Sequence, residues 1–231
     1  MHSHDNLTYT ARCRFRDNLT MKLFSERTVS YNPLSHIVGQ MTDLFVPICI
    51  GATVYFLENS TAKVLTEKLW FIKPTYFCCV PYVWAQLKQF YDEDENAKGL
   101  EMCRNAHVLG GSVSNNLIEF FHERNINLCK EYGTCEINFH IFSKYPRDPI
   151  ESIGNVNDHQ CTSIGNQGEL LARGRSVFMG YMNNDSKNRE CFDDQDYFHV
   201  PDQVHIDSNG NLFIFGRMTE LIKTSAGIPG M

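Results

Sequence analysis

An aromatic side chain, a glycine and a carboxylate stand close together in the run Glu131-Tyr132-Gly133-Thr134-Cys135-Glu136. An aromatic ring can stack on a nucleotide base, and a carboxylate can hold Mg²⁺ against phosphate oxygens. Taken alone, a tyrosine such as Tyr132 is more often a core residue and a glutamate such as Glu136 a solvated charge. Their position favours a ligand site, because both follow a strand-like segment, at the end where open α/β sheets bind ligands.

A second candidate feature is the run of small residues Gly110-Gly111-Ser112, which precedes a helical pattern. Residues with little or no side chain let a flat ligand approach the backbone closely. The same run is also typical of an ordinary strand-to-helix turn. Both interpretations stay open on this evidence alone.

The segments that would position these residues predict a parallel α/β sheet followed by a small β subdomain. Before residue 133, short runs rich in β-branched and aromatic residues alternate with helical patterns. Ser114 can cap the last of these helices. After about Pro149 the pattern changes to short β segments, including residues 169–172 and 203–206. We expect strands at residues 53–57, 75–80, 107–110 and 127–131, and helices at residues 61–71, 82–91 and 114–122.

The clearest hairpin joins residues 204–206 to residues 212–215 through Asn209 and Gly210. This pair is suited to the positive backbone angles of a tight turn. We therefore divide the chain into an α/β subdomain over residues 1–150, a small β subdomain over residues 151–216, and a hinge with the start of a further domain over residues 217–231.

Composition narrows the classes of protein and the compartment. A formal net charge of -6 and a pI near 5.8 give no basic surface for phosphate contacts, so nucleic acid is set aside. Nine cysteines without a C-x-x-C pair indicate reduced thiols and a cytoplasmic location. The longest apolar stretch, residues 44–55, is interrupted by Pro47 and is shorter than the ~20 residues that span a bilayer. We expect no transmembrane segment. Any contact with a membrane would then be peripheral, at the cytosolic face of an internal membrane.

Several motifs in a fixed order give the chain a specific resemblance. Tyr31-Asn32-Pro33-Leu34-Ser35-His36-Ile37 resembles a segment of the adenylate-forming (AMP-binding) superfamily, and Pro74-Thr75 with Val80-Pro81-Tyr82-Val83-Trp84 resembles the signature of its long-chain acyl-CoA synthetases. The motifs that follow in the family's order are Gly168-Glu169, Gly174-Arg175, Phe178-Met179-Gly180-Tyr181, His199, Asp202 and residues 216–222. With Ser3-His4-Asp5-Asn6, the chain looks closest to the bubblegum-type subgroup.

The resemblance implies an α/β domain with a small β subdomain, belonging to a long-chain fatty acid:CoA ligase that uses ATP, Mg²⁺ and coenzyme A. In such an enzyme a fatty acid is first joined to AMP and then transferred to the thiol of CoA. The implied catalytic residues are His36, in the acyl and adenylate pocket, and Glu136, which would ligate Mg²⁺. The implied nucleotide-binding residues are Gly110, Gly111 and Ser112 along the adenine, Tyr132 and Gly133 beside the base, Asp202 on the ribose hydroxyls, and Arg217 on the ribose or phosphate, with Thr219 at the hinge.

The resemblance also implies elements that these residues do not include. In the family a glycine-rich phosphate loop precedes the segment matching Ser3 to Asn6, and a C-terminal domain with a catalytic lysine follows the hinge. We therefore expect the 231-residue chain alone to be inactive in the family reaction. The alternative hypotheses are a non-catalytic remnant that binds a nucleotide, an acyl chain or a protein partner, and a truncated gene model.

Overall fold

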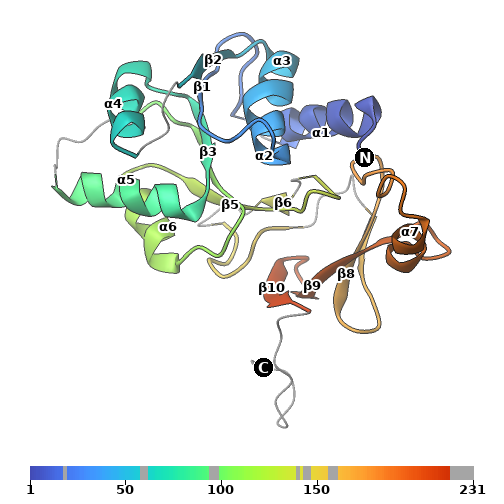
Figure 1. Ribbon diagram of the computed structural model, residues 1–231. Coiled ribbons are helices and arrows are strands. Elements are labelled where there is room, and N and C mark those ends of the chain that lie inside the picture. The colour runs from blue at the N-terminus through green and yellow to red at the C-terminus, as the bar shows by residue number, and fades with distance from the viewer. Residues whose placement is uncertain are drawn as a thin grey trace.

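The structure, a computed structural model, has a mixed α/β fold that confirms the expected fold class. Parallel strands and their helices form one part, and a small antiparallel sheet forms the other (Figure 1). The structure describes residues 1–17, 20–57, 62–93, 99–138, 141–142, 147–155 and 161–218.

The central sheet has the strand order β3-β4-β5-β6. Strands β3 (Tyr76–Cys79), β4 (Asn105–Val108) and β5 (Leu128–Tyr132) run parallel, and the short β6 (Ile141–Phe142) is antiparallel to β5. A separate parallel pair is formed by β1 (Arg27–Ser30) and β2 (Thr53–Phe56). All four residues of β3 and of β4 are buried, as expected for parallel strands covered on both faces.

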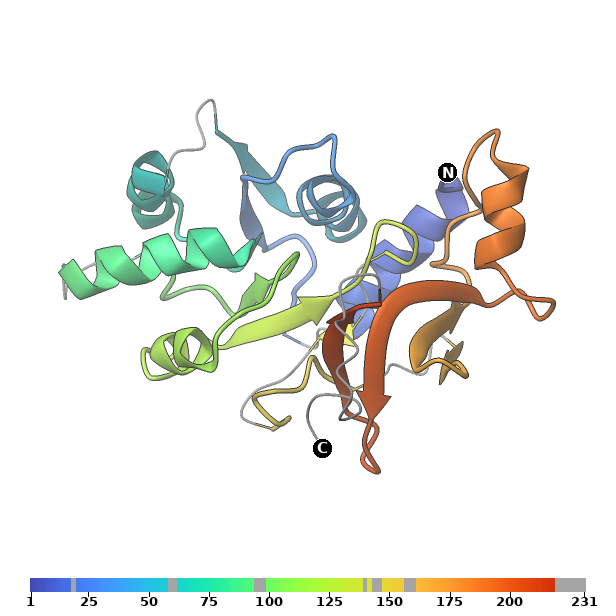
Figure 2. The same ribbon diagram turned by 60° about the horizontal axis from the view of Figure 1, so that its bottom comes forward.

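One face of this sheet is covered by α4 (Ala62–Ile72), α5 (Pro81–Glu93) and α6 (Asn115–His122). Trp84 of α5 lies at the centre of this core, with its ring 5.4 Å from that of Phe77 and 5.0 Å from that of Phe121. The indole N–H donates to the backbone carbonyl of His107 at 3.0 Å. The aromatic core and this bond fix α5 against β3 and β4. The three helices lie on the same side of the sheet (Figures 1 and 2).

The opposite face is covered by α1 (His4–Asp17) and by a helical run of α2 (Ile37–Gln40), the π-helical segment η1 (Met41–Phe45) and α3 (Val46–Ile50). Side chains alternate between the two faces along β3, so Tyr76 and Cys78 pack on this side and Phe77 on the other. The helical run ends at Gly51, whose left-handed backbone (φ +67°) closes α3.

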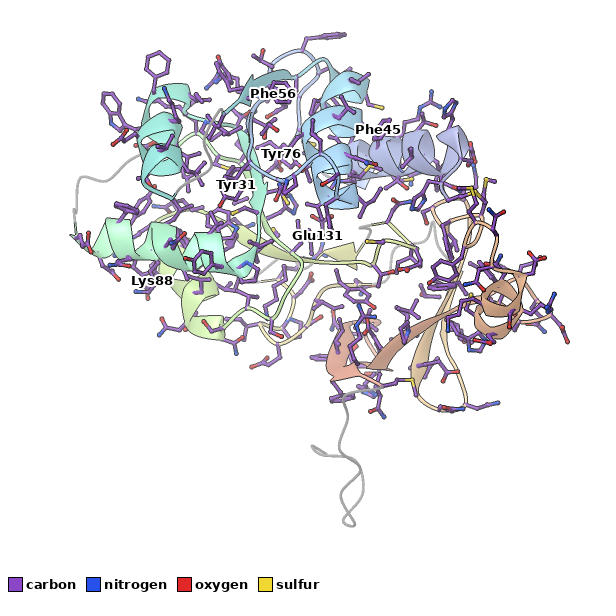
Figure 3. The ribbon with its side chains drawn as sticks, viewed as in Figure 1. Tyr31, Phe45, Phe56, Tyr76, Lys88 and Glu131 are labelled. Atoms are coloured by element: carbon purple, nitrogen blue, oxygen red, sulfur yellow. The ribbon has the colours of Figure 1, made fainter. Side chains whose placement is uncertain are left out.

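A buried polar cluster lies between α1 and the sheet. The guanidinium of Arg14 pairs with both carboxylate oxygens of Glu131, and its Nη2 also donates to the Tyr76 hydroxyl at 3.1 Å. The ring of His107 lies beside the same cluster, with Nδ1 3.6 Å from Glu131 Oε2. Figure 3 labels two members of this cluster, Tyr76 and Glu131, in the interior of the α/β part of the molecule. Burial and the nearby charge of Arg14 lower the pKa of His107 to about 3.

The depressed pKa of His107 predicts a loss of stability in mild acid. The folded protein keeps this ring neutral, whereas the unfolded chain protonates it near pH 6.5, so this contribution is complete above pH 6.5 and is lost as the pH falls toward 3. Between pH 7 and pH 5 the loss should be about 2 kcal/mol. Urea unfolding of the wild type and His107→Gln at both pH values measures it. An equal pH dependence in the two proteins would contradict the prediction.

The antiparallel sheet has the order β10-β9-β8-β7. Its strands are β7 (Cys161–Ile164), β8 (Glu169–Arg173), β9 (Phe198–Ile206) and β10 (Leu212–Arg217), and α7 (Asp185–Cys191) lies between β8 and β9 in the chain. The hairpin β9–β10 is the one expected from the sequence. Only Gly210 of the expected turn pair has a positive φ (+80°), because the Asp207 carboxylate organises the loop by accepting the backbone N–H groups of Asn209 and Asn211.

The first residues of α1 tie the two parts together. The Asn6 side chain donates to the backbone carbonyls of Arg175 at 2.8 Å and Val177 at 3.0 Å. Asp5 accepts two bonds from the Arg175 guanidinium, at 2.5 and 3.0 Å. The N-terminal end of α1 accordingly lies beside the antiparallel sheet in both orientations of the molecule (Figures 1 and 2).

The elements expected from the sequence are present with small differences in their ends. The strand expected at residues 107–110 is β4, which lies at residues 105–108, because the chain leaves the strand direction before Gly110 (φ +79°). Ser114 caps α6 as expected, accepting the Leu117 N–H at 3.4 Å. The sequence did not predict α1, the helical run from α2 to α3, β1, β6, β7 or α7. The boundaries at residues 150 and 216 remain predictions.

Two further observations concern thiols and membranes. Every cysteine whose side chain the structure describes is a free thiol. Within the described ranges, each helix is too short or too polar to cross a bilayer.

Candidate nucleotide-binding site

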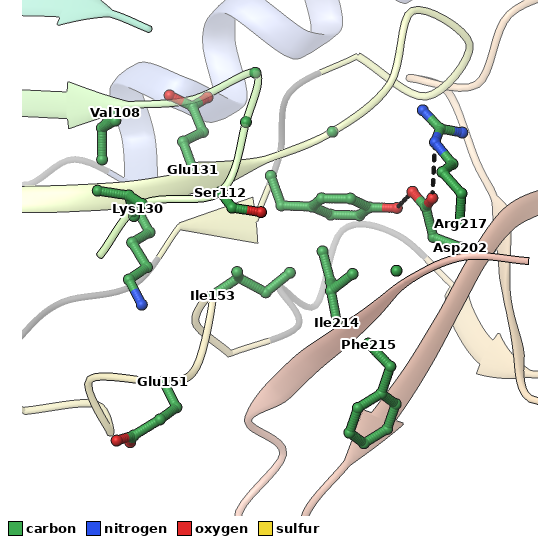
Figure 4. Close-up of a pocket in the computed structure, with 16 residues that line it drawn as sticks. Val108, Ser112, Lys130, Glu131, Glu151, Ile153, Asp202, Ile214, Phe215 and Arg217 are labelled. Carbon is green, nitrogen blue, oxygen red and sulfur yellow. Dashed lines mark hydrogen bonds and ion pairs between the residues drawn. The ribbon is translucent and has the colours of Figure 1, made fainter. Parts of the chain in front are cut away.

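A cavity of about 550 Å³ opens where β4 and β5 end and the hairpin β9–β10 faces them (Figure 4). Asp202 and Arg217 lie on one side of this cavity and Lys130 lies on the other (Figure 4). We refer to it as the base cavity. Its lining includes every residue predicted to bind the nucleotide: Gly110, Gly111, Ser112, Tyr132, Gly133, Asp202 and Arg217.

A second cavity of about 330 Å³ is lined by both residues predicted to be catalytic, His36 and Glu136. We refer to it as the phosphate-side cavity. Gly110, Gly133 and Arg217 line both cavities, so the two are neighbours. The fold therefore brings together nine of the ten residues that the sequence predicted for the site. The tenth, Thr219, lies outside the described residues.

One polar chain links the parallel sheet to the hairpin across the base cavity. The Tyr132 hydroxyl donates to Asp202 Oδ2 at 2.6 Å, and Arg217 Nε lies 3.1 Å from Asp202 Oδ1. Burial, and then the Asp202 charge, raise the pKa of Tyr132, so its hydroxyl stays protonated as a donor. Each carboxylate oxygen has two acceptor positions. Asp202 can therefore still accept hydrogen bonds from a ligand.

The glycine-rich turn after β4 forms an open wall of the same cavity. Gly110 needs its positive φ of +79°, which a residue with a side chain adopts only with strain. A Cβ at Gly111 would meet only Pro81 at 3.5 Å, in ordinary contact. Because Gly111 has no side chain, only its backbone lines the cavity at this position.

His36 is fixed by its own helix. Its Nδ1 accepts the backbone N–H of Val38 at 3.1 Å and caps α2. The side chain is exposed and lines the phosphate-side cavity. The hydrogen bond at Nδ1 therefore fixes the orientation of the ring, which lines the same cavity as Glu136.

Glu136 is held at its backbone and at its side chain by one loop. Its backbone carbonyl accepts the Phe178 N–H at 2.7 Å, and its Oε1 accepts the Tyr181 hydroxyl at 3.0 Å. Burial, and then the charge of Glu136, raise the pKa of Tyr181. Tyr181 belongs to one of the motifs that resemble the family, but the sequence predicted no role for it.

The residues present fit a Mg²⁺ ion that is bound together with phosphate groups. Mg²⁺ is usually held by one or two carboxylates, substrate phosphates and waters and not by an all-protein cage. Glu136 offers one such carboxylate in an open cavity. Over the described ranges no group of three or more histidine, cysteine, aspartate or glutamate side chains could hold a metal by itself. The donor set is consistent with metal that arrives with a nucleotide.

Sequence reasoning missed the far side of the base cavity. Lys130 lines it, and its ammonium donates to the backbone carbonyl of Ile150. Burial lowers the pKa of Lys130. The alternation of side chains in β5 was the available signal, because Lys130 must share a face with Tyr132 while Glu131 points to the other. Other lining residues that were missed include Glu151, Ile153, Ile214 and Phe215.

Comparison with known proteins identifies related chains. Residues 1–182 match the family described as AMP-binding enzyme. The long-chain-fatty-acid–CoA ligase ACSBG2 of Xenopus laevis is 30% identical over 292 residues, an alignment that covers 98% of this chain and 38% of that protein. ACSBG2 of Homo sapiens is 28% identical, with 98% of this chain and 42% of that protein covered. The chain thus spans well under half the length of these curated relatives.

Solved structures share the fold. O-succinylbenzoate coenzyme A synthetase (MenE) from Bacillus subtilis, in complex with ATP and magnesium ion, superposes with a TM-score of 0.86 at 20% identity and covers 97% of this chain and 48% of its own. ATP-bound MatB from Rhodopseudomonas palustris gives a TM-score of 0.85 at 19% identity, with 97% and 46% covered. At these identities the likeness establishes the architecture alone.

Proposed function

Because the chain belongs to the AMP-binding enzyme family, we propose that it supplies the adenosine- and magnesium-binding side of the site of an acyl-CoA ligase that activates long-chain fatty acids. The observation that carries the proposal is the convergence of nine predicted residues on two neighbouring cavities that share Gly110, Gly133 and Arg217. The relatives' names support the choice of a fatty acid.

In this proposal the base cavity takes the adenosine. The base would lie between the ring of Tyr132 and the backbone of Gly110 to Ser112. Stacking on the aromatic ring would hold it there. The ribose hydroxyls would donate to Asp202, whose carboxylate is oriented by Tyr132 and Arg217 at 2.6 and 3.1 Å. With the base and the ribose placed in this way, the phosphates would extend toward the phosphate-side cavity, because Arg217 lines both cavities.

The chemistry would proceed in two transfers. A carboxylate oxygen of the fatty acid attacks the α-phosphorus of ATP and the bond to pyrophosphate breaks, which gives acyl-AMP. The thiolate of CoA then attacks the acyl carbon and AMP leaves. Negative charge builds on the α-phosphate in the first transfer, where the guanidinium of Arg217 can stabilise it. Mg²⁺ held by Glu136 would supply further positive charge when bound. His36 would border the acyl and adenylate groups.

Two measurements test this proposal separately. Calorimetric titration with AMP should give saturable binding that adenosine competes. With ATP, Mg²⁺ and CoA, pyrophosphate release should depend on a long-chain fatty acid in any form of the protein that performs the reaction, and short-chain acids should not replace it. Absence of AMP binding would contradict the site itself. AMP binding without release would favour the alternative of a nucleotide-binding protein that lacks catalysis.

A further inference from the structure

The loop at residues 178–181 reaches Glu136 twice, and this double contact singles out Tyr181. Phe178 N–H donates to the Glu136 carbonyl at 2.7 Å and the Tyr181 hydroxyl donates to Glu136 Oε1 at 3.0 Å. Tyr181 and Glu136 both line the phosphate-side cavity. The backbone and the carboxylate of Glu136 are therefore fixed by the same four-residue segment.

Tyr181 is itself held in place from α7. Its backbone N–H donates to Asn188 Oδ1 at 2.7 Å, and the Asn188 side-chain amide donates back to the Tyr181 carbonyl at 3.0 Å. The Tyr181 ring packs edge-on against Phe178 with centroids 4.9 Å apart. A phenol restrained at its backbone and its ring can direct a hydrogen bond with little loss of freedom.

We propose that Tyr181 is a positioning residue for the metal-binding carboxylate of Glu136. The inference rests on the proposed function, in which Glu136 holds Mg²⁺ against the nucleotide phosphates. A carboxylate has two oxygens, and the bond from Tyr181 uses Oε1 without consuming Oε2. The phenol donor fixes the rotation of the carboxylate, which is how outer partners orient a metal ligand.

A purely structural role for Tyr181 makes a different prediction. If only its ring mattered, Tyr181→Phe would leave cation binding unchanged, because the variant retains the ring and its contact with Phe178. If the hydroxyl positions Glu136, the same variant should weaken the metal-dependent part of nucleotide binding and leave metal-free binding intact. The two roles are thus separable by one substitution.

The experiment is calorimetric titration of the chain with AMP in EDTA, with ATP in EDTA, and with ATP in excess Mg²⁺. In the wild type we expect Mg²⁺ to increase the affinity for ATP. In Tyr181→Phe the factor by which Mg²⁺ raises the affinity for ATP should be about tenfold smaller, while the affinity for AMP stays the same. Asn188→Ala should lose part of it, because the phenol is then less restrained.

Tyr197→Phe is the matched control, since it removes a phenol hydroxyl from the same part of the chain and Tyr197 lines neither cavity. An equal effect of Mg²⁺ in the wild type, Tyr181→Phe and Tyr197→Phe would overturn the role of Tyr181. AMP binding without any effect of Mg²⁺ in the wild type would overturn it as well. Absence of AMP binding in the wild type would instead contradict the proposed function on which the inference rests.

Discussion

Replacing Arg14 with methionine is expected to lower the free energy of unfolding by about 3–5 kcal/mol. The substitution leaves the carboxylate of Glu131 buried between α1 and the sheet without its guanidinium, and Tyr76 also loses a donor. Removing one partner of a buried pair is costly because the remaining charge is desolvated and uncompensated. Urea unfolding at neutral pH, followed by far-UV circular dichroism, measures the change.

Two further variants test whether the burial of the ion pair causes the loss of stability. The double variant Arg14→Met with Glu131→Leu should recover much of the loss, because apolar side chains can replace a buried pair at little cost. Arg175→Met should have a much smaller effect, although Arg175 also forms a two-bond pair with a carboxylate of α1, because that pair with Asp5 is exposed. A loss in Arg175→Met as large as that in Arg14→Met would show that burial is not the cause.

Replacing Asp202 with alanine should weaken binding of AMP at least about tenfold. One charge-assisted hydrogen bond is worth about 1.5–3 kcal/mol, and Asp202 is placed to accept from the ribose hydroxyls. Titration of both proteins with adenosine and with 2′,3′-dideoxyadenosine identifies the group responsible. The dideoxy compound should bind the wild type and Asp202→Ala about equally, because it has no hydroxyl for the carboxylate to accept.

The Asp202 variant also removes the partner of Tyr132 and Arg217, so a second comparison is needed. Tyr132→Phe keeps the ring and Asp202 while it removes the bond of 2.6 Å. It should cost less affinity for adenosine than Asp202→Ala. Glu190→Ala, an exposed carboxylate on α7, is the control and should change nothing. Unchanged binding of adenosine by Asp202→Ala would show that the ribose lies elsewhere.

Local sequence patterns indicated the part of the site that lies within short segments, and the family resemblance then assigned roles to its residues. Tyr132, Gly133 and Glu136 stand within five residues of one another, and the glycines at 110 and 111 follow β4 after one intervening residue. His36, Asp202 and Arg217 were placed by motifs that resemble those of a known family. The side-chain alternation in β5 would also have predicted Lys130, which shares a face with Tyr132.

Contacts between distant segments could not be predicted in the same way. Arg14 meets Glu131 across 117 positions, and Tyr181 meets Glu136 across 45. Nothing in either segment alone signals its partner, because a polar side chain in an amphipathic pattern is equally consistent with exposure to solvent. The helix α1 was missed for a similar reason: Asn6 and Arg14 are buried in it only because the backbone carbonyls of residues 175 and 177 and the carboxylate of Glu131 accept their hydrogen bonds.

The contacts of α1 have a consequence for the order in which the chain can fold during synthesis. Asp5 and Asn6 find their partners only at residues 175 and 177, and Arg14 finds Glu131 only after more than a hundred further residues are made. At about 5–20 residues per second, α1 waits roughly 10 to 30 s beside the ribosome before those partners emerge. Through that interval the polar groups of α1 stay without these partners, so α1 joins β5 and the antiparallel sheet only late in synthesis, although its apolar side chains can already pack on η1 and α3.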